Sequence, residues 1–377
     1  MNRTLSSLWN RADENREISH RPLTYLTFAG VCCRVFALLV VDLPETLHAA
    51  WIASLLGAIL AFPAVLFVYW LSGKGNPAAV LRSAFGKRFY PAFCLLFSAF
   101  LAADASSVFS MLSASASYSS LFSIPEWALS LLSFLAVALI VLRGGNSVSG
   151  VASVCLYAFP FLYVWMLILQ RNHLNFRYLV PILGPGSQKL MRCGLLCAGE
   201  YCLIPLSALL DDRKLITGKG RFTPVPPRSI FELFALSAIV VTALCALHAA
   251  TYPALPSLSR SRFAQLDLLL SIGKSNQSIQ LPMLLLWFAF LTVCASFLLY
   301  LSGRLLSAAF GIRFGGTAIA AAAGTFLFGF FLNNNLSLRL TSVFPFLFTA
   351  FIFVGWALSR FKNRDARKAR PKKGSGV

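Results

Sequence analysis

The chain has 377 residues, of which 58% are hydrophobic and 12% are charged, and its formal net charge is +20. Its mean hydropathy of +0.72 excludes an ordinary soluble domain, because a soluble domain cannot hide that much apolar surface from water. The composition therefore places most of the chain in a lipid bilayer.

Apolar stretches of roughly 20 residues, the length that crosses about 30 Å of hydrocarbon as a helix, predict an all-α membrane protein with about ten transmembrane helices. They lie at residues 22–43, 49–72, 91–117, 126–142, 148–170, 188–210, 229–251, 281–303, 314–332 and 338–359. The first twenty residues lack the basic start and apolar core of a cleaved signal, so we expect the first span to be retained. The predicted organisation is a cytoplasmic segment at 1–21, a polytopic transmembrane domain at 22–359 and a basic, disordered cytoplasmic tail at 360–377.

Basic residues are distributed unequally between the two sides of the predicted membrane domain. Ten spans put both termini on one side, where 24 of the 33 basic residues fall, whereas the loops on the other side hold six. The positive-inside rule then places both termini in the cytoplasm. This distribution accounts for the net charge without a nucleic-acid partner, and we expect none.

Three ionisable residues lie deep in predicted spans: Arg34 in the first, Asp104 in the third and Glu200 in the sixth. Each charged group at mid-membrane costs about 2.5–3.5 kcal/mol on insertion scales, so such residues usually face a cavity or a partner. They are therefore candidate functional residues. The alternative is that Arg34 and one carboxylate form a buried ion pair with a structural role.

Glu200 lies in the stretch RCGLLCAGEYCLIPLSALL, where Gly194, Gly199 and Pro205 all lower helix stability. In lipid, the backbone groups freed by a helix break must face protein or a wet site, and transporters build substrate sites in this way. A zwitterionic amino acid fits such chemistry. Equally, the glycines can serve only to let helices pack closely.

The remaining reactive residues form no recognisable site. The nine cysteines all fall in predicted spans without a CxxC pair, and the four histidines are scattered. No Walker loop, HExxH or GxSxG motif is present in the sequence. We therefore expect no catalytic residue, no metal and no cofactor.

Several segments, taken in order, resemble the spore germination permease family, the integral membrane B subunits of nutrient germinant receptors in the amino acid/polyamine/organocation superfamily. The matching segments are ISHRPLTYLTF, AAWIASLLGAILA, SLFSIPEWAL, LRGGNSVSGVAS, LNFRYLVPILGPGSQKL and SIGKSNQSIQLPMLLLWFAFLTVCASFLLY. The resemblance implies two inverted five-helix repeats in which helices 1 and 6 are interrupted around a ligand.

Carried onto this chain, the resemblance predicts ligand-binding residues at both helix breaks. They are Arg34, Val35, Phe36 and Ala37 in the first helix and Cys197, Ala198, Gly199, Glu200 and Tyr201 in the sixth. Asp104 on the third helix is expected to complete the wall of the ligand-binding site. Glu200 can be neutral and donate to backbone groups, or ionised and paired with Arg34 or a ligand ammonium; the nearby arginine favours the ionised form.

The resemblance further implies a ligand-sensing subunit that binds a small nutrient, such as an amino acid, in the spore inner membrane or cell membrane. Its expected partners are A-type and C-type receptor subunits and the lipid bilayer. Alternative functions are a secondary transporter of amino acids or polyamines and a scaffold whose ligand site is defunct. The chain departs from the family pattern at Ala49, at Gln277-Ser278-Ile279-Gln280, and near the first break at Arg34 and Ala37, which admits a divergent paralogue.

Overall fold

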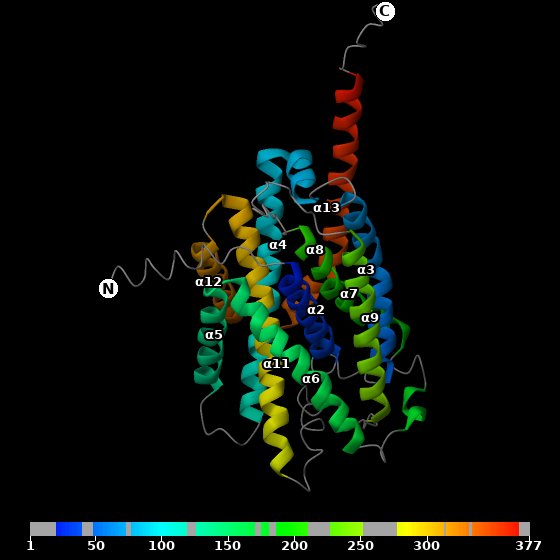
Figure 1. Cartoon of the computed structure of the whole chain (residues 1–377), viewed down its shortest axis with the longest axis vertical. Helices are drawn as coiled ribbons and strands as arrows, with labels where there is room; N and C mark the ends of the chain where they lie inside the picture. The colour runs from blue at the N-terminus through cyan, green and yellow to red at the C-terminus, as the bar shows by residue number, and fades with distance from the viewer. Residues whose placement is uncertain are drawn as a thin grey trace, which may run out of the picture.

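The computed structural model describes most of the predicted membrane domain, and every regular element in the described parts is helical (Figure 1). The described residues are 20–39, 48–72, 77–118, 126–169, 175–180, 186–209, 227–251, 277–312, 314–331 and 334–368. The all-α membrane fold class predicted from the sequence is confirmed. The loops at 211–226 and 252–276, and the last nine residues, lie outside the described part.

Each predicted apolar stretch overlaps a described helix. The helices are α2 (His20–Ala37), α3 (Ala50–Ser72), α4 (Pro77–Tyr118), α5 (Glu126–Leu142), α6 (Gly145–Leu169), α7 (Ser187–Tyr201) with α8 (Leu203–Leu209), α9 (Pro227–Thr251), α11 (Gln277–Phe310), α12 (Phe314–Phe331) and α13 (Asn334–Lys368), and a 3-10 helix, η4, spans Phe176–Leu179. By length and composition, six of the described spans can cross a membrane, or seven if the bent α5–α6 pair is one span. The number ten therefore stays a prediction.

Several helices extend beyond their predicted ends, and α4 and α13 do so with a change in the predicted organisation. α4 contains a kink at Gly86, whose φ of 74° lies in the left-handed region, so a short helix at 77–85 precedes the long span. α13 continues to Lys368, nine residues into the segment predicted to be a disordered tail. Lys, Arg and Ala favour helix, and the stretch from 360 to 368 contains neither glycine nor proline, so nothing in it ends the helix.

α5 and α6 are joined by a sharp turn rather than a loop. The two helices meet at an angle of 118°, and the link consists of Arg143 and Gly144, whose φ of 91° favours glycine. The Gly144 amide donates to the Val141 carbonyl at 2.9 Å, and the Ser147 amide donates to the Gly144 carbonyl at 3.1 Å. Arg143 and Gly144, at the start of the RGGNSVSG stretch, therefore form a tight turn, and the rest of the stretch begins α6.

The helices pack in two groups. α3 packs extensively against α7 and α9, and α4 packs extensively against α11 and α12. α2 contacts helices of both groups, and α13 contacts α4, α3 and α7. Phenylalanines fill the α4–α13 interface, where the Phe97 ring lies 5.1 Å from Phe344 and 5.5 Å from Phe348, centroid to centroid.

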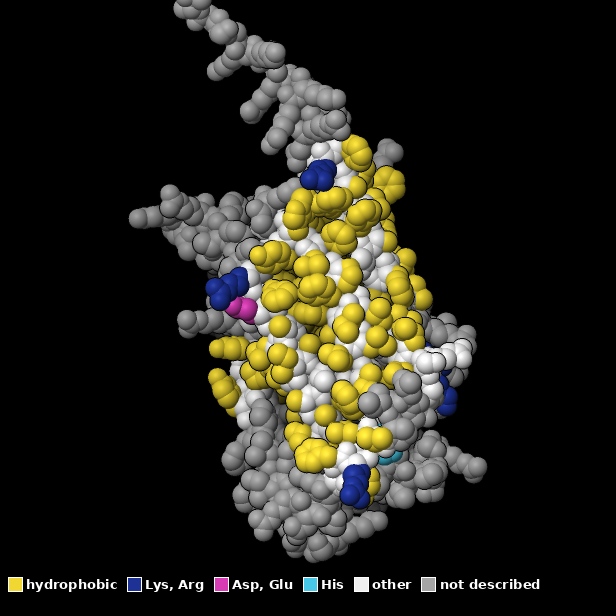
Figure 2. Space-filling view, turned by 90° about the vertical axis from the view of Figure 1, so that its right-hand side faces the viewer, with side chains coloured by type: hydrophobic (Ala, Val, Ile, Leu, Met, Phe, Trp, Pro, Cys, Tyr) yellow, Lys and Arg dark blue, Asp and Glu magenta, His cyan; other side chains and the backbone are white. Residues whose placement is uncertain are grey.

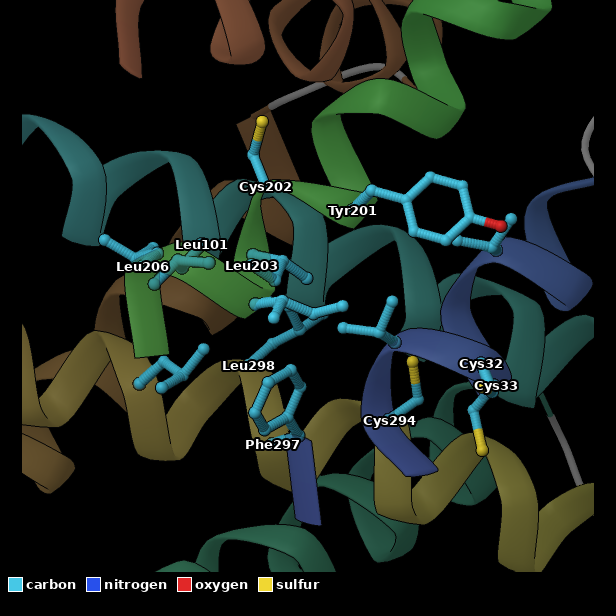
Figure 3. Close-up of a cluster of buried hydrophobic side chains, with 14 of the residues drawn as sticks. Cys32, Cys33, Leu101, Tyr201, Cys202, Leu203, Leu206, Cys294, Phe297 and Leu298 are labelled. Carbon is cyan, nitrogen blue, oxygen red and sulfur yellow. The ribbon is translucent and has the colours of Figure 1, made fainter. Parts of the chain in front are cut away.

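The sixth span divides into α7 and α8 at Cys202 (Figure 3), although Cys202 keeps helical backbone angles (φ −67°, ψ −12°) and its amide donates to the Ala198 carbonyl at 3.0 Å. Pro205 has no amide hydrogen, so the Tyr201 carbonyl loses its helical donor at this point. The predicted break residues, 197–201, are instead helical and form the last turn and a half of α7. In the first span, Arg34 to Ala37 are likewise helical and form the end of α2.

Apolar side chains cover the middle of the face in Figure 2, whereas arginine and lysine lie near its ends and at its margins. Exposed leucines and phenylalanines on α3, α5 and α9 contribute to the lipid-facing surface of the molecule. This distribution is the one expected of a protein surrounded by hydrocarbon.

Candidate functional site

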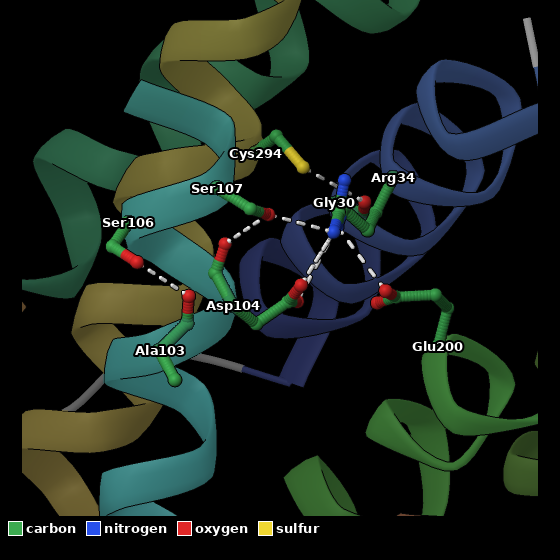
Figure 4. A network of polar contacts seen from close by, with 8 residues as sticks. All are labelled: Gly30, Arg34, Ala103, Asp104, Ser106, Ser107, Glu200 and Cys294. Atoms are coloured by element: carbon green, nitrogen blue, oxygen red, sulfur yellow. Dashed lines mark hydrogen bonds and ion pairs between the residues drawn. The ribbon is translucent and has the colours of Figure 1, made fainter. Parts of the chain in front are cut away.

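Arg34 lies in the last turn of α2, where the partial negative charge of a helix end favours a cation. Its side chain is completely buried and reaches α4 (Figure 4). The Arg34 Nε donates to Asp104 Oδ1 at 3.1 Å and Oδ2 at 3.3 Å. The Arg34 Nη2 also donates to Asp104 Oδ1. The pair thus joins α2 to α4. Two nitrogens of the guanidinium donate to one carboxylate, as is typical of arginine–carboxylate pairs.

Ser107 completes the α4 side of this contact. Its hydroxyl accepts from the Arg34 Nη2 at 2.9 Å and donates to the Asp104 carbonyl, one turn earlier in α4, at 2.7 Å. Ser106, its neighbour, donates only within α4, to the Ala103 carbonyl at 2.7 Å. The sequence analysis missed Ser107, although its position three residues after Asp104 puts both side chains on one helix face.

Glu200 approaches the same guanidinium from α7. Its Oε1 lies 3.1 Å from Arg34 Nε, so one arginine contacts two carboxylates, and Asp104, Arg34 and Glu200 form a triad across three helices. The exposed fractions are 6% for Asp104, 0% for Arg34 and 1% for Glu200. Removing one partner of a buried pair typically costs about 3–5 kcal/mol, because it leaves an uncompensated charge. The structure therefore unites the three ionisable residues that the sequence singled out.

The other predicted site residues surround this triad as packing or hydrogen-bonding groups. Phe36 is edge-on to the rings of His248 and Phe290, at centroid distances of 6.0 and 6.2 Å. The Tyr201 hydroxyl is 2.8 Å from the Ser54 hydroxyl, which is itself 3.1 Å from Thr242 Oγ1, so a polar chain joins α7, α3 and α9. Fully buried residues account for the rest: Val35, Ala37, Cys197, Ala198 and Gly199.

Close helix packing, the alternative explanation for the glycines, is also present. A Cβ on Gly194 would lie 2.7 Å from the Leu56 side chain, and one on Gly57 would lie 2.4 Å from Cys197 Cβ. Both contacts join α3 to α7. The sixth span thus combines tight packing in its first half with the α7–α8 boundary at Cys202, two residues after Glu200.

The described parts contain no group of three or more His, Cys, Asp or Glu side chains that could hold a metal ion. The nine cysteines are buried and unbridged. An apolar cavity of about 370 Å³ lies away from the triad, between α5, α11 and α12, and none of its lining residues belongs to the predicted site. In the state described here, the triad itself is enclosed by protein.

The family described as spore germination protein matches residues 27–197 of this chain. The match covers 171 of the 377 residues and agrees with the family that the sequence resembles. The matched segment includes Arg34 and Asp104 and ends three residues before Glu200. Among curated proteins, the comparison found no match.

Solved structures match a larger share of this chain. Two mutants of the manganese transporter of Eremococcus coleocola each superpose with a TM-score of 0.53 at 15% identity, covering 94% of this chain and 88% of theirs. At this identity the likeness shows the fold, which is that of a membrane transporter. Together the comparisons support a permease-like membrane protein and suggest a non-enzymatic role.

Proposed function

We propose that the chain is the ligand-sensing membrane subunit of a spore nutrient germinant receptor and that it binds a small nutrient, such as an amino acid, between α2 and the α7–α8 break. The observation that carries the proposal is the buried triad, in which Arg34 of α2 meets Glu200 beside the interrupted helix. A zwitterionic amino acid has a carboxylate that complements Arg34 and an ammonium that complements Asp104 or Glu200. The triad supplies a positive group and a negative group that lie closer together than the length of one side chain.

The enclosed state gives this site a sensing mechanism. Without a ligand, the contacts of Arg34 with Asp104 and Glu200 hold α2, α4 and α7 together. A nutrient can insert only if these side chains separate, so it binds the open arrangement more tightly than the closed one. A ligand shifts a conformational equilibrium by its differential affinity for the two states, and the opening of the triad would be that shift.

The conformational change must then be transmitted to other proteins. In this proposal, the chain works with A-type and C-type receptor subunits in the spore inner membrane, and both termini are cytoplasmic. The basic loop at 211–228 and the basic C-terminal segment give these subunits, or anionic lipid headgroups, a surface to contact.

The proposal is tested in spores that carry the double variant Arg34→Gln/Glu200→Gln, which keeps Asp104. Neutral side chains of similar size remove the cation that the carboxylate of a zwitterion needs and one of the two carboxylates that its ammonium can meet, so we expect the nutrient response to be lost at a normal protein level. The matched control is Glu232→Gln, which alters an exposed pair with Arg228 (2.7 Å) and should leave the response unchanged. A normal response from the folded double variant would make the triad a structural element only.

Secondary transport is the second candidate, because the fold is that of a transporter. Uptake of labelled amino acid into proteoliposomes under a proton or sodium gradient separates the two. Concentrative uptake by the isolated chain would favour transport over sensing.

A further inference from the structure

We propose that the apolar cavity between α5, α11 and α12 holds an acyl chain of an anionic phospholipid whose phosphate is bound by Arg143. The cavity has a volume of about 370 Å³. The three helices around it pack against one another on one flank of the bundle (Figure 1). The site is separate from the triad, so the proposal does not depend on the sensing role.

The cavity exists because small side chains line part of its wall. Ala318, Ala322 and Ala323 line it from α12, and Ala138 lines it from α5. The rest of the lining consists of leucine, phenylalanine, valine and isoleucine. A water molecule in a cavity needs two to four polar partners, and hydrocarbon side chains give it none. The chemistry of the wall therefore selects an apolar occupant.

The cavity runs from the lipid-facing surface into the bundle. Four of its lining residues are between 40% and 49% exposed: Leu131 and Leu135 of α5, and Ile319 and Phe326 of α12. At the other extreme, Leu299 of α11 also lines the cavity and is only 1% exposed. In a bilayer, the molecules that reach such an opening are acyl chains. An acyl chain that enters supplies the dispersion contacts that the wall of an empty cavity lacks.

The volume fits a hydrocarbon chain better than a protein segment. An apolar cavity of about 150 Å³ is large enough to bind benzene, and this cavity has more than twice that volume. It can therefore take a run of methylene groups. A partner helix is about 10–12 Å across with its side chains, so it could place little more than one side chain in this space.

A basic residue follows the cavity directly in the sequence. Val141 and Leu142, at the end of α5, both line the cavity, and Arg143, the next residue, is exposed. Arg143 lies in the turn between α5 and α6, which the positive-inside rule places on the cytoplasmic side. A guanidinium can hold a phosphate with two parallel hydrogen bonds. Its positive charge favours a headgroup of net negative charge over a zwitterionic one, so an anionic phospholipid satisfies both the cavity and Arg143.

The test uses the full chain in detergent micelles with phosphatidylglycerol that carries a photoreactive diazirine in one acyl chain. Mass spectrometry then locates the labelled residues after illumination. We expect labelling of α5 and α12 that saturates and is displaced by unlabelled phosphatidylglycerol at lower concentration than by phosphatidylcholine. The lipid-facing surface of α9, where Leu236 and Ile239 are exposed, should show only labelling that does not saturate. Labelling of α5 and α12 that resembles that of α9, or its absence, overturns the proposal.

Two variants separate the cavity from the headgroup contact. Ala322→Phe puts a ring into the cavity and should abolish the saturable labelling, whereas Leu327→Phe, at an exposed position of α12 outside the cavity, should keep it. Arg143→Gln should remove the preference for phosphatidylglycerol over phosphatidylcholine. Saturable labelling that survives in folded Ala322→Phe places the acyl chain elsewhere, and an unchanged preference in Arg143→Gln refutes the phosphate contact. The wild-type labelling pattern decides the first point even if Ala322→Phe does not fold.

Discussion

Ser106 and Ser107 are adjacent, buried and bonded to their own helix, and they differ in one contact, the 2.9 Å bond from Arg34 to Ser107. Ser107→Ala removes an acceptor from a buried guanidinium, whereas Ser106→Ala removes only a bond within α4. We expect Ser107→Ala to lower the free energy of unfolding by about 1–2 kcal/mol more than Ser106→Ala. Thermal unfolding of the two purified variants measures the difference, and equal losses would mean that the contact contributes nothing.

The residues of the triad could be selected from the sequence, but their arrangement could not. A charge inside an apolar stretch is visible in the sequence, so Arg34, Asp104 and Glu200 were all identified as candidates. The pairing of Arg34 with Asp104 spans 70 positions in the chain, and it depends on how α2 and α4 pack. Ser107 was hidden for another reason: it belongs to a serine-rich span in which close packing already explains the serines.

At the scale of the helices, the contact between α3 and α7 is tightest at Gly57. Among the described glycines of this interface, it leaves the least room for an added Cβ. A methyl group there would lie 2.4 Å from Cys197 Cβ and 3.0 Å from the Ala198 backbone nitrogen. Because backbone cannot move aside cheaply, we expect Gly57→Ala to lower stability by about 1–3 kcal/mol. The same change at Gly150 in α6 meets nothing within 4 Å and should stabilise by up to about 1 kcal/mol.

Both variants can be compared with wild type by thermal unfolding in detergent. If Gly57→Ala were as stable as Gly150→Ala, the α3–α7 approach would be looser than described, and α7 could not be held firmly beside α2. The comparison therefore checks the packing that positions Glu200.

Hydrophobicity predicted where the helices are, and it was less informative about where they end. All ten apolar stretches became helices because spans in lipid must satisfy their backbone internally. The errors fall at the ends: the break after Tyr201 follows from Pro205 four residues later, and the extension of α13 follows from charged helix formers that a hydrophobicity criterion ignores. The kink at Gly86 was missed because a single glycine carries little signal.

For the whole molecule, the membrane orientation can be tested because all nine cysteines are buried. A membrane-impermeant thiol reagent should therefore label introduced cysteines over a low background. The positive-inside rule predicts that Ser275→Cys, in a predicted external loop, is labelled in intact cells, whereas Gly218→Cys, in a predicted cytoplasmic loop, is labelled only after permeabilisation. The reverse pattern would place both termini outside.

The length of α13 has a mechanical consequence. In its inner part, the rings of Phe344 and Phe348 pack against Phe97 of α4, the helix that also carries Asp104. Its outer part, nine residues from 360 to 368, adds about 14 Å of rod at 1.5 Å per residue, and this rod projects beyond the bundle (Figure 1). Because α13 packs against α4, a slight tilt of α4 would tilt α13 as well. The length of α13 would turn that tilt into a larger displacement of its basic end.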